Sequence, residues 1–169
     1  MAAQAPEDPI VKALQEYTTC DVADALVKLK QSHGGFLPGL ILWSPQRQEG
    51  STKIVGPAYT VQYAAKDDPR PKWPSHYVFA RDVGTTPPGP LFKVVAVNEP
   101  VKFSNDGRDI IINPGDYLIG DVNGVVVLPM EIAEQALPLM AKQVDADSKM
   151  AVEIKKGMTF TEASKRFRL

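Results

Sequence analysis

The sequence is poor in the residues from which disulfides and multi-cysteine or histidine-rich metal sites are built. It contains one cysteine, Cys20, and two histidines, His33 and His76, in 169 residues. A single cysteine excludes an intramolecular disulfide, and neither histidine has metal-ligand spacing to another histidine, cysteine or glutamate. This composition is typical of a reducing compartment, so we expect a soluble, cytoplasmic protein. We expect Cys20 itself to be a small buried residue.

Long apolar runs and an excess of charge of one sign are also missing. No stretch approaches the roughly 18 apolar residues of a membrane-spanning helix, and the first residues, MAAQAPEDPIVKAL, do not resemble a signal peptide. The formal net charge is −1, with lysine and arginine spread along the chain. We therefore expect neither a membrane nor a nucleic acid as partner. Nucleophile elbows, phosphate loops and dinucleotide fingerprints are absent from the sequence as well.

Proline is abundant instead, and its placement indicates one loop-rich middle. More than half of the fifteen prolines lie between Pro57 and Pro100. The stretch KDDPRPKWPSHY cannot be regular structure, because proline lacks a backbone donor and biases the preceding residue toward extended backbone. We find no internal repeat and no linker, so residues 1–169 are predicted to form a single domain.

Helical periodicity marks both ends of the chain. Apolar residues from Pro9 to Leu29 recur with i, i+3, i+4 spacing, with a break near Thr18. Thr19 or Asp21 is the expected cap of a second helix, and the pair Gly34-Gly35 its expected end. After Pro129 a long amphipathic helix, with Pro138 as a candidate kink, should end at Gly157. Thr159 or Thr161 should cap a last short helix.

The middle alternates and turns like a series of strands. Tyr59–Ala64 is one predicted strand, followed by Val78–Ala80, FKVVAV, VKF, DIIIN, YLIGD and GVVVLP, with turn residues at nearly every break. The run from Gly124 to Leu128 has no polar alternation, which predicts a strand buried on both faces. The whole pattern predicts a mixed α/β fold with helices at both ends.

Four stretches in this order resemble the RraA-like family, which includes the metal-dependent 4-hydroxy-4-methyl-2-oxoglutarate aldolases. They are TTCDVADAL (18–26), IVGPAYTVQ (54–62), VFARDVGTTPP (78–88) and PGDYLIGDVNGVVVLP (114–129). DDPRPKWPSHY resembles the fungal branch. The resemblance implies a swivelling β/β/α domain, assembly as a homotrimer or a pair of trimers, and a magnesium- or manganese-dependent lyase acting on small 2-oxo acids.

The chain departs from the family in one respect. Members of the family carry a central segment with a Gly-Gly loop for the substrate carboxylate and a strand ending in an Arg-Asp motif. Here Ser75-His76-Tyr77 runs directly into Val78-Phe79-Ala80, so the chain resembles a shortened form of this pattern. None of that segment's residues can be carried over, and we expect weak or absent aldolase activity.

The remaining candidate residues each have a functional and a structural interpretation. Arg81 and Asp82 could bind a substrate carboxylate and a metal, or form a surface ion pair. His76 could act as an acid or base, or be exposed in its loop. Asp121 could be catalytic and bind the metal at the rim of a cleft between subunits. Alternatively, its carboxylate could form an Asx turn with the backbone of GDVNG while Gly124 adopts positive φ.

Three functions remain open at this point. The first is a metal-dependent aldolase or decarboxylase of small 2-oxo acids, or a relative repurposed in a biosynthetic pathway. The second is a non-catalytic scaffold that binds a partner or regulates it. The third is a small-ligand binding or cyclisation role that depends on cavity shape and a few polar groups.

Overall fold

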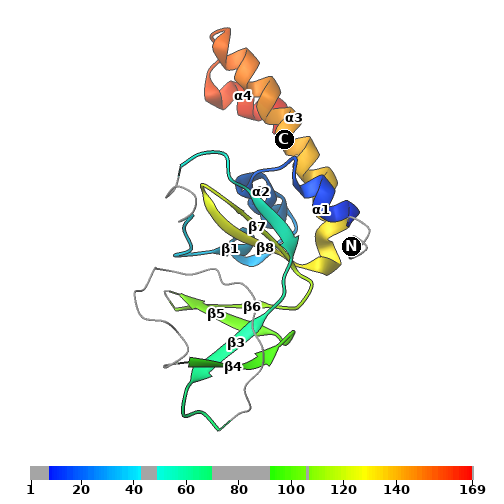
Figure 1. Ribbon diagram of the computed structural model, residues 1–169. Helices are drawn as coiled ribbons and strands as arrows, with labels where there is room; N and C mark the ends of the chain where they lie inside the picture. The colour runs from blue at the N-terminus through cyan, green and yellow to red at the C-terminus, as the bar shows by residue number, and fades with distance from the viewer. Residues whose placement is uncertain (1–7, 43–48, 70–91, 106, 169) are drawn as a thin grey trace.

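The computed structural model describes residues 8–42, 49–69, 92–105 and 107–168. Its centre is a four-stranded antiparallel sheet in the order β1-β8-β7-β2. The bounds of these strands are β1 (Phe36–Leu37), β2 (Ile54–Pro57), β7 (Tyr117–Asp121) and β8 (Gly124–Leu128). Figure 1 shows the helices on one side of this sheet and two separate two-stranded ribbons on the other.

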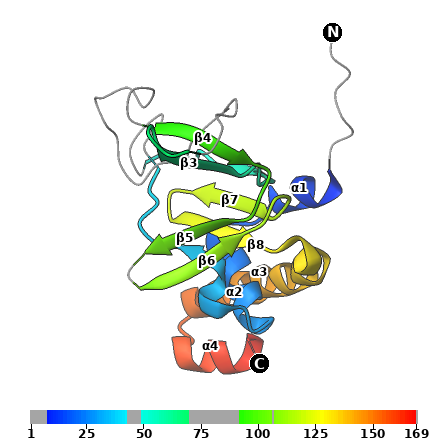
Figure 2. The ribbon, with the colours of Figure 1, turned by 90° about the horizontal axis from the view of Figure 1, so that it is seen from below.

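The two ribbons are antiparallel hairpins. One pairs β3 (Val61–Ala65) with β4 (Phe92–Val97), and the other pairs β5 (Val101–Asn105) with β6 (Arg108–Ile112). Figure 2, seen from below, places the β5–β6 ribbon in front of the central sheet. The mixed α/β architecture predicted from the sequence is therefore confirmed.

The helices are α1 (Pro9–Leu14), α2 (Thr19–Lys28), α3 (Ala133–Lys155) and α4 (Phe160–Phe167), with short 3-10 turns η1 (Ser32–Gly35) and η2 (Met130–Ile132). The predicted end of α3 at Gly157 is confirmed. The φ of Gly157 is +104°, and Met158 N–H donates to the backbone carbonyl of Glu153 at 3.1 Å. Thr159 caps α4 through a reciprocal capping box with Glu162. Helix α3 continues through Pro138.

Two details at α2 correct the sequence-based expectation. The cap is Thr18, one residue earlier than expected, and Asp21 completes a capping box with it. The helix ends before Lys30, whose φ of +61° already breaks the helical geometry, so Gly34 and Gly35 shape the following turn instead. The prediction failed because several residue types can cap a helix and the sequence places three of them together.

Strand β8 separates two hydrophobic cores. On the helical side, Val126 and Leu128 pack with Ile119 and with apolar residues of α1, α2 and α3 such as Leu26 and Met140. On the other side, Val125 and Val127 pack with Leu37, Ala58 and Ile112, and against them lie Val101, Phe103 and Ile110 of the second ribbon. All five residues of β8 are buried, which confirms the prediction of a strand covered on both faces.

The predicted strand at Tyr59–Ala64 is only partly right, because the chain changes partners there. It leaves the central sheet after Pro57 and joins the ribbon at Val61. Between them, Ala58 N–H donates to the backbone carbonyl of Asp116 at 2.7 Å. The hydroxyl of the buried Thr60 donates to the backbone carbonyl of Glu99 at 2.5 Å. The predicted strand Val78–Ala80 lies outside the described residues.

Candidate functional site

Asp121 lies at the tight turn between β7 and β8, beside the beginning of α2. One oxygen, Oδ1, accepts hydrogen bonds from the Thr19 hydroxyl at 2.7 Å and from Asn123 N–H at 2.8 Å. The other, Oδ2, accepts from Thr19 N–H at 2.9 Å. The bond to Asn123 is the Asx turn expected from the sequence, and Gly124 has the expected positive φ of +139°. The carboxylate thus connects a turn of the central sheet to the first residue of α2.

These hydrogen bonds also set the charge of Asp121. Partial burial by itself would raise its pKa, but the bonds from Thr19 and Asn123 outweigh burial and leave the pKa below the ordinary value of 3.8. The side chain is therefore ionised at neutral pH. Within the described ranges, no group of three or more histidine, cysteine, aspartate or glutamate residues could hold a metal ion.

A small cavity of about 240 Å³ opens beside this carboxylate. Its walls come from the end of α1, the beginning of α2, the segment before β2 and the turn after β7. The lining residues are Gln15, Tyr17, Thr18, Gly50, Ser51, Thr52, Lys53, Asp121, Val122 and Asn123. Apolar atoms form most of the exposed lining, Asp121 contributes a carboxylate, and Lys53 is the basic residue among them.

The Lys53 amine is already engaged by backbone carbonyls. It donates to Leu14 and Gln15 at 2.6 Å each and also to Tyr17, all at the carboxyl end of α1. Partial burial lowers the pKa of Lys53, while Asp121, Glu16 and Asp21 act in the opposite direction. A cation at this end of a helix satisfies carbonyls that have no partner within the helix. Lys53 therefore holds α1 against the segment that leads into β2.

Asp121 is the predicted site residue that the structure places at this cavity. His76, Arg81 and Asp82 lie in the range 70–91, outside the described residues. His33 lies in η1, with a φ of +55°, and lines a different cavity. Asp21 faces Thr18 in the capping box of α2.

Cys20 differs from its prediction. It is exposed rather than buried, because it lies on the solvent side of the first turn of α2 while Val22 and Ala25 face the core. Partial burial of its thiol, and then the negative charges of Asp121, Asp21 and Asp24, raise its pKa above the ordinary value of 9.0. The thiol is protonated at neutral pH, so Cys20 is a poor nucleophile.

Sequence reasoning missed two structural residues, Lys53 near the Asp121 end of β7 and Asp116 at the other end of that strand. Lys53 gives no local signal, since its partners lie 36 to 39 positions earlier in the chain. Asp116 indicates only a turn in the sequence, yet its side chain is almost fully buried. It accepts from Asn113 N–H at 2.8 Å and Met130 N–H at 3.2 Å.

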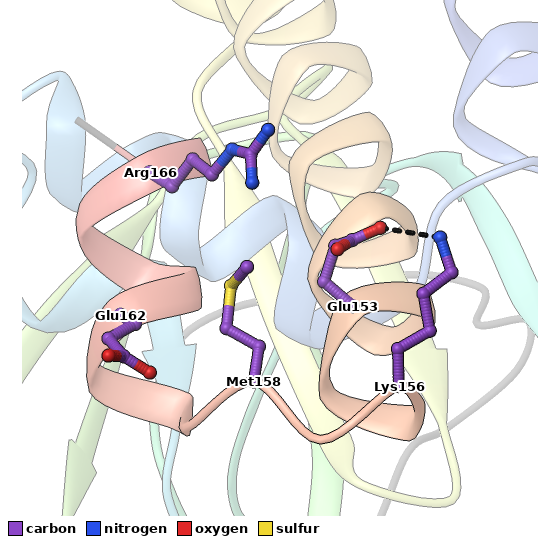
Figure 3. Close-up of a pocket in the computed structure, with 5 residues that line it drawn as sticks. All are labelled: Glu153, Lys156, Met158, Glu162 and Arg166. Carbon is purple, nitrogen blue, oxygen red and sulfur yellow. Dashed lines mark hydrogen bonds and ion pairs between the residues drawn. The ribbon is translucent and has the colours of Figure 1, made fainter.

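A further cavity, of about 460 Å³, lies between α3 and α4 at the far end of the helical hairpin. Figure 3 shows Met158 rising between the two helices, with Arg166 above it and the Glu153–Lys156 ion pair on α3. Glu162 is occupied by the capping box at Thr159. The carboxylates of this cavity thus stabilise the ends of the two helices.

No family model matches the chain, and no curated protein matches it. Solved structures do resemble it. An uncharacterized protein from Pseudomonas syringae pv. tomato str. DC3000 has a TM-score of 0.72 at 20% identity, over 91% of this chain and 96% of that one. A structure described as one of the novel cellulases from microbes associated with the gut ecosystem has a TM-score of 0.65 at 16% identity, over 88% and 90%.

The third similar structure comes from the family that the sequence resembles. RraAS2 of Streptomyces coelicolor, described as an unusual member of the RNase ES inhibitor RraA protein family, has a TM-score of 0.59 at 17% identity, covering 87% of this chain and 100% of that one. At this identity the likeness concerns the fold. Among the described residues, no helix is long and apolar enough to cross a membrane. The chain has a mixed α/β fold of the RraA-like type.

Proposed function

We propose that this protein is a non-catalytic RraA-like scaffold that acts as a binding or regulatory protein. The observation that carries the proposal is the state of Asp121, whose two oxygens accept three hydrogen bonds from Thr19 and Asn123. A carboxylate used in this way stabilises the junction of sheet and helix. These bonds use three of its roughly four lone-pair sites, so a metal ion would find at most one free site at this carboxylate, on Oδ2.

The electrostatics of the neighbouring cavity support the same proposal. Lys53 is the basic residue of its wall, and its amine donates to three carbonyls at the end of α1. A cation engaged in this way is not free to bind a substrate carboxylate. Both charged groups of this cavity therefore contribute to the fold.

The alternative is a weak metal-dependent aldolase or decarboxylase of a small oxo acid. The observation in its favour is the cavity of about 240 Å³, with an ionised carboxylate and the hydroxyl-bearing residues Ser51 and Thr52 in its wall. In that function Asp82 and Asp121 would bind Mg²⁺ or Mn²⁺, Arg81 would bind the substrate carboxylate and His76 would transfer a proton. Asp121 by itself, with about one lone-pair site left, would hold a metal weakly, and the described residues contain no group of three metal-ligating side chains to complete the site.

One experiment distinguishes the two functions. Pyruvate release is measured from 4-hydroxy-4-methyl-2-oxoglutarate and from oxaloacetate, with Mg²⁺, with Mn²⁺ and with a chelator. The scaffold proposal expects turnover far below about 1 per second, the lower range of ordinary enzymes, and no difference between the wild type, Asp121→Ala and Arg81→Ala. Metal-dependent turnover at or above that rate, lost in either variant, would establish the lyase instead.

We also propose that the scaffold self-associates, most simply as a homotrimer. The support is a set of large apolar side chains that stay exposed on β2, β3, β4 and the β2–β3 connection, namely Ile54, Tyr59, Tyr63 and Phe92. Light scattering at micromolar concentration should give about three times the chain mass. Tyr59→Glu, at the most exposed of these positions, should shift the population toward the monomer, whereas Val152→Glu on α3 should not.

A further inference from the structure

The strand β6 is paired along only one of its edges. Residues 108–112 pair with β5, and no other described strand pairs with them. The faces of the ribbon are also defined: Ile110 and Ile112 pack toward the central sheet, while Asp109 and Ile111 point the other way. The free edge of β6 therefore separates an inner face from an outer face.

A cavity of about 450 Å³ runs along this free edge. It is lined by Gly107, Arg108, Asp109, Ile110 and Ile111 without interruption. Consecutive residues of a strand point to opposite faces, so a cavity on one face would touch every second residue. Contact with all four strand residues Arg108–Ile111 means that the cavity follows the backbone edge of the strand, where unpaired N–H and C=O groups lie.

The wall opposite β6 is formed by η1 and the end of β8. Its residues are Gln31, Ser32, His33, Gly35, Val127 and Pro129, and the buried Asp116 lies with Asn113 at the same cavity. In this wall η1 packs closely on β8, since a Cβ on Gly35 would lie 2.2 Å from the Val127 carbonyl oxygen. The groove is therefore bounded by a strand edge on one side and a closely packed turn on the other.

Of the two charged β6 residues that line the groove, Asp109 has an ion-pair partner in the described residues and Arg108 has none. Asp109 is neutralised by Lys102 at 2.5 Å and also accepts from Ser104 at 2.6 Å. Across residues 8–42, 49–69, 92–105 and 107–168, no acid forms an ion pair with Arg108. Arg108 shares the inner face with Ile110, and Ile111 lies on the outer face with 53% of its surface exposed. A guanidinium at the edge of a groove favours a carboxylate as its partner.

We propose that this groove binds an extended peptide segment of a partner protein, which adds as a strand to the free edge of β6. Backbone hydrogen bonds to β6 supply affinity, and side chains alternating between the two faces supply specificity. The segment carries an acidic residue that meets Arg108 on the inner face. Three positions away, roughly 10 Å along the strand, it carries an aliphatic residue that packs on Ile111 on the outer face. The odd spacing follows from the opposite faces of these two residues.

This inference extends the scaffold function but does not depend on it. The groove lies on the second ribbon and η1, whereas the Asp121 cavity lies on α1, α2 and the segment before β2. Detection of lyase turnover would overturn the proposed function and leave the peptide groove untouched. Failure of peptide binding would leave the turnover result untouched.

The first test is selection of phage-displayed random dodecapeptides on the purified full chain. We expect enriched sequences that alternate apolar and polar residues and carry an acid three positions from an aliphatic residue. Parallel selection on Arg108→Glu should lose the acidic preference. Selection on Arg166→Glu, which changes an arginine of α4 away from the groove, should keep it. No enrichment, or the same enriched sequences on Arg108→Glu, would overturn the proposal.

The second test uses one enriched peptide, labelled for fluorescence anisotropy. Arg108→Glu and Ile111→Ser should each weaken binding at least tenfold, and changing the peptide's acid to its amide should weaken binding to the wild type similarly. Ile154→Ser, at an exposed aliphatic residue of α3, is the matched control and should have no effect. N-methylation at alternate peptide residues should abolish binding in one register and not in the other. Binding that tolerates methylation in both registers would exclude strand addition.

Discussion

The carboxylate of Asp121 holds Thr19 by two groups at once, its backbone N–H at 2.9 Å and its hydroxyl at 2.7 Å, across 102 positions of sequence. Thr19 is the first residue of α2 and is almost fully buried. The negative charge therefore lies at the positive end of the helix and satisfies an N–H that has no partner within it. Together with the Thr18–Asp21 capping box, this contact fixes where α2 begins against the sheet.

Removal of this carboxylate should destabilise the protein clearly. Asp121→Ala should lower the free energy of unfolding by about 2 kcal/mol, because the hydrogen bonds are to a charged acceptor and leave buried donors without one. The measurement is urea unfolding followed by circular dichroism. Asp145→Ala is the control, since its exposed ion pair with Lys149 should contribute less than about 1 kcal/mol. Equal effects of the two substitutions would show that the contact between Asp121 and Thr19 does not stabilise the fold.

The contribution of Asp121 should depend on pH in one direction. Its pKa in the folded protein lies below the ordinary 3.8, so its stabilising effect is fully present above that value. The effect is lost as pH falls through the folded-state pKa. The difference in unfolding free energy between wild type and Asp121→Asn should thus be constant from pH 7 to about 5 and shrink toward pH 3. A difference that grows on acidification would show the opposite sign of linkage.

Gly35 and Gly107 offer a matched pair of glycine substitutions. Both have positive φ, +68° and +74°, but only Gly35 is crowded, because a Cβ added there would lie 2.2 Å from the Val127 carbonyl oxygen. Gly107→Ala should cost about 1 kcal/mol from backbone strain alone. Gly35→Ala should cost about 3 kcal/mol or more, since a backbone oxygen cannot move aside easily. Thermal unfolding of the two variants measures the difference.

Thr159 and Thr161 test the cap of the last helix. Thr159 accepts from Glu162 N–H and donates to its carboxylate in return, while Thr161 lies within α4 and is exposed. Thr159→Ala should destabilise the helix by about 1 kcal/mol, and Thr161→Ala should have little effect. Hydrogen exchange of residues 160–167 is the appropriate measurement. Equal acceleration of exchange in both variants would show that the capping box is not the stabilising element.

Tyr117 should make the protein sensitive to alkali. Burial, and then its 2.8 Å hydrogen bond to Asp8, raises the pKa of Tyr117 from 10.0 to about 12. Its stabilising effect is therefore present below pH 10 and lost as pH rises through about 12. Wild type should be more stable than Tyr117→Phe by about 1 kcal/mol at neutral pH, and the difference should disappear in that alkaline range. Ultraviolet titration should show that the variant lacks a tyrosine ionising late.

The sequence by itself determined the local elements of this protein. Periodicity and turn residues were enough to place the terminal helices, the stop at Gly157 and most strands, because each depends on contacts only a few positions apart. They narrowed the cap of the last helix to Thr159 or Thr161, and the structure shows Thr159. The alternation-free run of β8 even predicted burial on both faces. The turn at Asp121 was predictable for the same reason, since Asn123 lies two residues away.

The tertiary structure decided what these elements do to one another. Only the folded chain brings Asp121 to Thr19, Lys53 to the end of α1, and the free edge of β6 beside η1. It also exposes Cys20, which its residue type and its lack of a histidine at suggestive spacing had predicted to be buried. Such contacts join residues tens of positions apart, and many pairings are compatible with the same local pattern. The packing of the two hydrophobic cores against β8 selects one set of pairings. That set determines which partner each charged side chain meets.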